Sequence, residues 1–262
     1  MFNAVTDVVG INRLTKTIFT RAAGAVVGMA NAEVKQEESG KKTVLLCAKG
    51  TTEAANRKIR QRIIDTGFVP MTFHCWGYGP AAVEQVIKDG YINGGVIEYA
   101  SDWLDRIAGG SSYPPDDRYE NAGKLGLPQV FVPGSCDFVV ANPGTFPDRK
   151  MQPHNQAAGL FRSKKEELIQ VGQEIGEKLS KSKGPVTVVI PLKGFSICDG
   201  NGGPLTDLDA DMGFIEGIAP FEGKIKIKKV NAHVLEDKFA DAVIDAFLEN
   251  VALAEETAVR VL

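Results

Sequence analysis

Short runs of β-branched and apolar residues alternate with longer amphipathic windows along most of this chain. An apolar run of this length, bounded by Gly, Pro or polar residues, is typical of a buried strand. The runs that we expect to form strands are Thr43–Ala48, Phe68–His74, Gly95–Tyr99, Gln129–Val132, Val186–Leu192 and Lys224–Val230.

The windows between these runs repeat apolar residues at spacings of three and four, which predicts helices. The expected helices are Thr52–Thr66, Pro80–Asp89, Ser101–Ala108, Tyr119–Leu125, Ser163–Lys181, Asp207–Ile218 and Glu236–Asn250. The window from Ser163 opens with the capping-box pattern Ser163-x-x-Glu166.

Strands that alternate with helices indicate right-handed crossovers between parallel strands. The expected fold class is therefore α/β, with an open, mostly parallel, Rossmann-like or flavodoxin-like sheet and helices on both of its faces. Lys224–Val230 alternates charged and apolar residues, as an edge strand with one face in water does.

The chain divides into three parts on this pattern. Residues 1–34 hold one long helical window, Ile11–Ala32, which we expect to serve interdomain or partner docking; residues 43–250 form a single α/β domain, and 251–262 form a C-terminal tail. The stretch 133–162 is rich in Gly, Pro and Asn and shows no periodicity, so we expect a long loop there, and loops of that length are usually functional or disordered.

Composition and charge narrow the classes of function. The chain has 262 residues, 24% of them charged, with a net charge of −3, which argues against a nucleic-acid surface and against electrostatic binding to a membrane. Its apolar stretches fall well short of the roughly 20 residues that a membrane span needs. The four cysteines are widely spaced and contain no C-x-x-C pair, which favours a reduced, cytoplasmic protein.

In an open parallel sheet, ligands bind outside the carboxyl ends of the strands. Two of the loops there suit an anion, because each places free backbone N–H groups at a helix start: Gly50-Thr51-Thr52 and the loop with Gly77, Gly79 and Pro80. The alternative for each is a plain turn that needs only a glycine and an N-cap. The other glycines considered as cofactor-binding residues are Gly134, Gly200, Gly202 and Gly203.

Several reactive side chains fall in the same set of loops. His154 is a candidate general base with Asp137 as its orienting carboxylate, or alternatively a loop-stabilising hydrogen-bond partner. Cys136 and Ser196 are possible nucleophiles, although a buried or capping role is the competing interpretation. Asp199 and Glu98 complete the candidate catalytic set. No ligand pair has a recognisable metal spacing, and His74 and His233 are interpreted as structural.

Four stretches of the sequence carry a family resemblance. These are MFNAVTDVVGINRLTKTIFTRAAGAVVGMA, GLPQVFVPGSCDFV, QPHN and PLKGFSICDGNGGPLTD, at Met1–Ala30, Gly126–Val139, Gln152–Asn155 and Pro191–Asp207. Together they resemble the C-terminal half of the tomato mosaic virus resistance protein-like (Tm-one-like) ATP-binding family. The resemblance implies nucleotide binding, with ATP as the possible cofactor. Members of that family usually carry a preceding α/β domain, so a separate partner subunit with that domain is expected here, in a homo- or hetero-oligomer.

Two functions compete on these observations. The first is a subunit of a small-molecule enzyme of the Tm-one-like family, with hydrolytic or carbon–carbon bond cleaving chemistry on a carbonyl or carboxylate metabolite. The second is an ATP-dependent binding or regulatory module without turnover, in which Gly50–Thr52 and the loop at Gly200–Gly203 hold phosphates. A scaffold that docks a partner through Ile11–Ala32 is a third possibility.

Overall fold

A computed structural model describes residues 7, 9–33, 40–200 and 202–261, and the chain divides into two units, Met1–Gly40 and Lys41–Leu262. The first unit contains helix α1 (Arg13–Ala30). The Asn12 side chain accepts hydrogen bonds from the backbone N–H groups of Leu14 and Thr15, and the Asn12 N–H donates to the Thr15 hydroxyl. This capping box starts the helix at Arg13, two residues later than the sequence pattern predicted. The helix carries exposed apolar side chains, among them Leu14, Val26 and Met29.

The second unit is built on a six-stranded sheet in the order β2-β1-β3-β4-β8-β9, and each neighbouring pair is parallel. The strands are β1 (Thr43–Ala48), β2 (Val69–His74), β3 (Gly95–Glu98), β4 (Gln129–Phe131), β8 (Val186–Pro191) and β9 (Lys226–Val230). The predicted α/β fold with an open parallel sheet is confirmed, and β9 lies at an edge as its charge alternation indicated.

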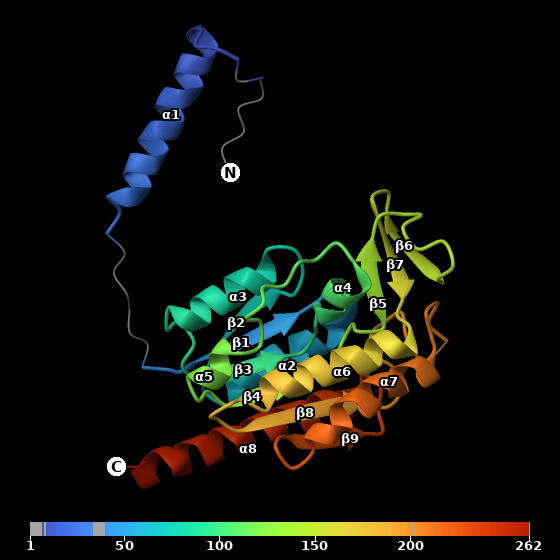
Figure 1. Ribbon diagram of the computed structural model, residues 1–262. Helices are drawn as coiled ribbons and strands as arrows, with labels where there is room; N and C mark the ends of the chain where they lie inside the picture. The colour runs from blue at the N-terminus through green and yellow to red at the C-terminus, as the bar shows by residue number, and fades with distance from the viewer. Residues whose placement is uncertain (1–6, 8, 34–39, 201, 262) are drawn as a thin grey trace. The chain divides into compact units, whose positions relative to one another are not determined.

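Helices cover both faces of this sheet (Figure 1). Leu46 is in register with Ile97, and both belong to the apolar core under α2 (Glu53–Asp65) and α8 (Asp237–Val261). Leu45 and Val96 face the opposite way, toward the helices of the second layer, because successive side chains alternate across a strand. That layer contains α3 (Gly79–Lys88), α4 (Trp103–Ala108), α5 (Asn121–Lys124) and α6 (Lys165–Leu179), with α7 (Leu208–Ile218) packed on α6.

The stretch 133–162 is not the structureless loop that the sequence pattern predicted. It contains β5 (Phe138–Ala141), β6 (Met151–Asn155) and β7 (Ala158–Arg162), which pair as an antiparallel sheet in the order β5-β7-β6. Figure 1 shows this small sheet beside α4, at one end of the large sheet. The prediction failed because β6 is largely exposed and contains Pro153, so it lacks the apolar run that marks a buried strand.

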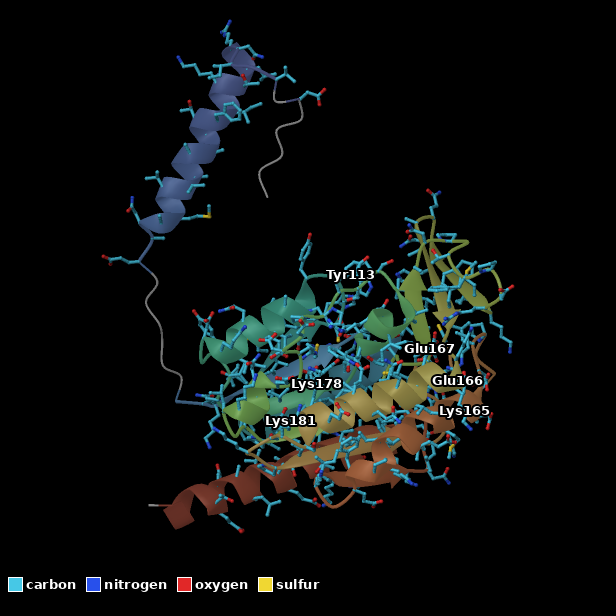
Figure 2. The ribbon with its side chains drawn as sticks, in the orientation of Figure 1. Tyr113, Lys165, Glu166, Glu167, Lys178 and Lys181 are labelled. Atoms are coloured by element: carbon cyan, nitrogen blue, oxygen red, sulfur yellow. The ribbon has the colours of Figure 1, made fainter. Side chains whose placement is uncertain are left out.

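Two helix ends differ in detail from the sequence interpretation. Helix α6 begins one residue later than the proposed capping box, since the Lys164 N–H donates to Glu167 at 2.8 Å and no such bond joins Ser163 to Glu166 in the described residues. Figure 2 labels Glu166 and Glu167 at this end of the helix. Helix α8 continues as far as Val261, through the residues expected to form a tail. Within the described part of the chain, no helix has the length and apolar character needed to cross a membrane.

Candidate functional site

A cavity of about 410 Å³ opens at the carboxyl ends of the first strands of the large sheet. One side of it comes from residues that end β1 and β2, and the other side comes from the small sheet. The lining residues are Lys49, Gly50, Thr51, His74, Trp76, Phe138, Val140, His154, Asn155, Ala158, Leu160 and Ile197. This is the place where ligands bind in open parallel sheets, as the strand-end argument predicted.

Lys49 directly follows β1 and supplies a buried positive charge on the side of the cavity that the large sheet forms. Its side chain is only 6% exposed, and its ammonium has no hydrogen-bond partner among the described residues. The nitrogen lies 5.4 Å from the centre of the Phe138 ring. Burial acts to lower the pKa of Lys49, but neighbouring negative charges, led by Asp105, outweigh it and raise that pKa. The ammonium therefore stays charged at neutral pH, and none of the residues that the structure describes provides a counter-group within hydrogen-bonding distance.

Gly50–Thr52 forms a short 3₁₀ turn that leads directly into α2. The Thr51 and Ser135 hydroxyls are 2.7 Å apart, and the Ile197 N–H donates to the Thr51 carbonyl. A Cβ built on Gly50 meets nothing within 4 Å, and its φ is not in the positive range. Neither packing nor backbone conformation requires glycine here, so the bare backbone leaves open space at the cavity wall.

Two histidines contribute to the same cavity from opposite sheets. His74 is the last residue of β2, and burial, followed by the charge of Lys49, lowers its pKa. His154 lies in β6 with an exposed side chain. His154 was predicted from the sequence as a candidate base, His74 was interpreted as structural, and Lys49 was not among the candidate residues. Only their positions in the sequence could have indicated these two residues, because Lys49 and His74 stand at the carboxyl ends of adjacent parallel strands.

Asp137 lies in a different, buried cluster and is bonded to Ser196. The Ser196 hydroxyl donates to Asp137 at 2.7 Å, and no hydrogen bond joins Asp137 to His154 in the described part of the chain. Burial, followed by the charge of Asp199, raises the pKa of Asp137 to about 7. Asp199 accepts from the Phe195 N–H, and its carbonyl lies 2.8 Å from the His233 ring. These groups hold the β8–α7 loop in place and do not line the cavity.

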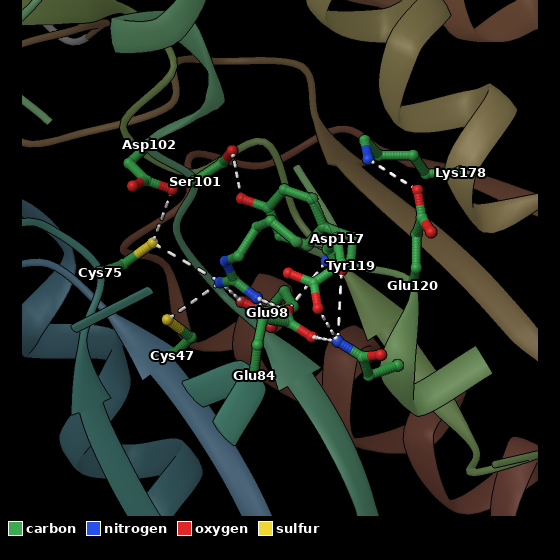
Figure 3. Close-up of polar contacts among 12 residues, drawn as sticks. Cys47, Cys75, Glu84, Glu98, Ser101, Asp102, Asp117, Tyr119, Glu120 and Lys178 are labelled. Atoms are coloured by element: carbon green, nitrogen blue, oxygen red, sulfur yellow. Dashed lines mark hydrogen bonds and ion pairs between the residues drawn. The ribbon is translucent and has the colours of Figure 1, made fainter. Parts of the chain in front are cut away.

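Cys136 and Glu98 are likewise away from the cavity wall. Cys136 is fully buried, and burial raises the pKa of its thiol, which keeps the thiol protonated and unreactive. Glu98 accepts two hydrogen bonds from Arg118, at 2.6 and 2.5 Å, and Glu84 accepts a third at 3.0 Å. Figure 3 shows Glu84 and Glu98 close together in this network, Glu84 from α3 and Glu98 from β3. Glu98 therefore belongs to a buried structural ion-pair network.

Most of the candidate glycines have a structural reason to be glycine. A Cβ on Gly134 would lie 2.1 Å from the Tyr99 carbonyl, and one on Gly79 would lie 1.8 Å from the His74 carbonyl. Gly200 and Gly203 face similarly close backbone atoms, and Gly77 and Gly202 have positive φ. Thr52 is buried and donates to the Lys49 carbonyl. The glycines 200, 202 and 203 line a second pocket of about 380 Å³ beside His233. Of the predicted cofactor-binding residues, Gly50 and Thr51 line the main cavity.

The residues that line the main cavity determine which chemistry it can support. It holds Lys49 with its buried cation, two imidazoles and the backbone of the Gly50–Thr51 turn, against a largely apolar opposite wall. Across the described residues, no group of three or more His, Cys, Asp and Glu side chains is arranged to hold a metal ion. The arrangement suits binding of an anionic or carbonyl oxygen beside a proton-transfer group.

Comparison with known proteins shows that both units of the chain match domain models of the same protein family. The model of the uncharacterised protein family (UPF0261) C-terminal domain matches residues 41–251, and that of its N-terminal domain matches residues 1–35. The chain is 30% identical to a UPF0261 protein of Clostridium tetani over 93% of its length, and 32% identical to one of Mesorhizobium japonicum over 95%. It is 28% identical over 95% of its length to the ToMV resistance protein Tm-1 of Solanum lycopersicum.

The chain spans 62%, 64% and 35% of the lengths of these three relatives, in the same order. Among solved structures, the Lac repressor overlaps with a TM-score of 0.25 at 10% identity, covering 95% of this chain and 88% of that one. That overlap is too small to carry an argument.

The expected separate partner subunit is a wrong prediction. It rested on the absence of an N-terminal domain, whereas the N-terminal family model matches residues 1–35 of this same chain and the C-terminal one matches 41–251. The segment with α1, expected as a docking helix, falls within that N-terminal match.

Proposed function

Because the chain belongs to the uncharacterised protein family UPF0261, whose name states no reaction, we propose a function from the cavity itself. The cavity is the active site of an enzyme that acts on a small carbonyl or carboxylate metabolite, and carbon–carbon bond cleavage fits it better than hydrolysis. The observation that carries this proposal is Lys49, a residue of the cavity lining whose buried ammonium has no hydrogen-bond partner in the described residues.

Lys49 is the electrostatic group of the proposed reaction. A carbonyl compound that loses a proton or a carbon fragment develops negative charge on its oxygen, and a fixed cation in a dry site stabilises that charge strongly. Lys49 meets this need, since its raised pKa keeps it protonated. The same protonation makes it a poor amine nucleophile, so we assign it to charge stabilisation and not to covalent chemistry.

His74 is the proposed base. Its lowered pKa keeps the imidazole neutral at neutral pH, and it lines the cavity with Lys49. In a retro-aldol type of cleavage, His74 takes the proton of the substrate hydroxyl, the carbon–carbon bond breaks, and its electron pair moves onto the carbonyl oxygen as an enolate held by Lys49. The proton then returns to the enolate carbon. We assign the orientation of the substrate hydroxyl to His154, which lines the opposite wall.

Hydrolysis through a covalent intermediate has less support. The candidate nucleophiles Cys136 and Ser196 are fully buried and do not line the cavity. Thr51 lines it, but its hydroxyl is paired with Ser135 at 2.7 Å. Within the described residues, no hydrogen bond joins either hydroxyl of that pair to a histidine or a carboxylate, so the pair lacks the activating contact that a nucleophile needs.

The proposal is tested with a panel of hydroxy-keto and keto acids, followed by substitution of the two central groups. Lys49→Met and His74→Asn should each lower kcat/KM by about 100-fold or more for any acid that the protein cleaves, as loss of a charge-stabilising group or a general base does. The matched control is Lys181→Met, an exposed lysine in the loop after α6, which leads to the opposite ends of the strands (Figure 2). Equal activity of Lys49→Met and Lys181→Met would remove Lys49 from the reaction.

ATP binding without turnover is the second candidate. The observation that favours it is Gly50–Thr52, which starts α2 beside Lys49 at the cavity wall. A helix start with a lysine is a suitable place for a phosphate. Titration calorimetry with ATP decides between the two, since this candidate requires heat of binding that Lys49→Met abolishes, together with no turnover in the acid panel.

A further inference from the structure

The far wall of the cavity is apolar, and its residues come from the small sheet. Phe138, Val140 and Leu160 are 2%, 8% and 5% exposed and form one apolar cluster, against which Ala158 packs. All four line the cavity. Beside them, Trp76 and Ile197 also line it and remain 37% and 63% exposed. Two large apolar side chains open to solvent beside an apolar wall leave a surface that an apolar group of a ligand would cover.

Charge and aromatic character restrict that ligand further. The cation of Lys49 lies 5.4 Å from the Phe138 ring, so the charged part and the apolar part of the cavity adjoin. Trp76 adds a second aromatic surface from the loop after β2. Aromatic side chains favour offset-stacked or edge-on contact with another ring. A ligand that matches all of these features has a carboxylate at one end and a ring at the other.

We propose that the substrate is an organic acid that carries an aromatic ring, with its acid and carbonyl oxygens at Lys49 and its ring against Phe138, Leu160 and Trp76. This inference rests on the proposed function and names the substrate class of that same site. The size agrees with it, because an apolar cavity of about 150 Å³ suffices for benzene, and the cavity of about 410 Å³ leaves room for the acid group.

Ala158 is the specificity-determining position in this arrangement. It is the first residue of β7, it is partly buried, and it lines the cavity with the smallest side chain of the apolar wall. A larger side chain there would fill the space of the ring and leave the end at Lys49 unchanged. Ala157, the residue before it, is exposed, lies outside the cavity lining and offers a matched control.

The test compares phenylpyruvate with pyruvate, two keto acids that differ by the ring alone. Calorimetry on the full chain should give an affinity at least about tenfold higher for phenylpyruvate, from burial of the ring. Ala158→Phe should reduce this affinity ratio at least about fivefold and Ala158→Leu should reduce it less, whereas Ala157→Phe should leave it unchanged. Lys49→Met should weaken both acids by a similar factor and keep the ratio. Melting curves establish that each variant is folded.

The outcomes separate this inference from the proposed function. Equal affinity for the two acids, or a ratio that Ala158→Phe and Ala158→Leu do not change, would overturn the aromatic substrate class. If Lys49→Met still weakened both acids, the acid-binding role of the cavity would stand. Absence of binding for both acids in the wild-type chain would overturn the two proposals together.

Discussion

Replacing Arg118 with methionine should destabilise the α/β unit by about 3–5 kcal/mol, the usual cost of removing one member of a buried ion pair. Arg118 is 0% exposed, and its partners Glu84 and Glu98 are 1% and 5% exposed. Methionine fills much of the same volume but leaves the carboxylates without their cation. Glu84 keeps its bonds from the Tyr119 N–H and from Asn121, at 2.9 and 2.7 Å, so the loss falls mainly on Glu98.

The loss of unfolding free energy caused by Arg118→Met should be smaller at acid pH than at neutral pH. Burial raises the pKa of Glu98, and Arg118 acts to lower it, so removal of Arg118 raises that pKa further. At a pH between the pKa of Glu98 in the unfolded chain and its raised pKa in the folded variant, Glu98 is protonated only in the folded state. The contribution of Glu98 to the stability of the variant is therefore largest at acid pH and is lost as the pH rises through its raised pKa. The difference between Arg118→Met and the wild type should shrink as the pH falls from about 7 toward about 5.

Urea unfolding followed by tryptophan fluorescence measures this loss, because Trp76 and Trp103 both lie in the α/β unit. The matched control is Arg57→Met, whose arginine side chain is 76% exposed and pairs with Glu53. It should cost less than about 1 kcal/mol. The double variant Arg118→Met/Glu98→Leu should be more stable than Arg118→Met alone, since it removes the uncompensated charge. The reasoning is refuted if Arg118→Met costs no more than Arg57→Met.

Three further outcomes are expected. Gly50→Ala should change the free energy of unfolding by less than about 0.5 kcal/mol, whereas Gly134→Ala, whose Cβ would lie 2.1 Å from the Tyr99 carbonyl, should destabilise clearly in the same urea assay. Asp211 lies in α7 beside Arg162 at 2.5 Å, and burial raises its pKa to about 9 although Arg162 acts to lower it, so the folded chain keeps a proton that the unfolded chain loses. Stability should therefore fall as the pH rises from about 4 to about 9, and Asp211→Asn should flatten the fall in unfolding curves. Cys136 should resist iodoacetamide in the native protein and react in urea, as peptide mass spectrometry would show, and fast native labelling would contradict its assigned burial.

The large sheet was predictable mainly because its inner strands, β1, β3, β4 and β8, are buried on both faces and appear in the sequence as largely apolar runs. The predicted and observed bounds of β1 are the same, Thr43–Ala48. The small sheet was not predictable by that signal. Strand β6 is exposed and interrupted by Pro153, and β5 is only four residues long, so neither shows a recognisable period.

The location of the site followed from the sequence, but its composition did not. The strand-end rule selected Gly50, Thr51 and His154, which do line one cavity. It could not show that Asp137 would bond to Ser196, 59 residues away, because that contact depends on how the β8–α7 loop folds. Lys49 was missed for a different reason, since a lysine after a strand is normally solvated and only the fold reveals that this one is buried.

The insertion of the small sheet between β4 and α6 divides the cavity into two parts of different origin. The charged part, with Lys49 and His74, is fixed by the parallel sheet on which the whole unit depends. The apolar part belongs to the small antiparallel sheet, in which β6 is the exposed outer strand. Substitutions in the small sheet can therefore change the shape of the apolar part without disturbing the main sheet.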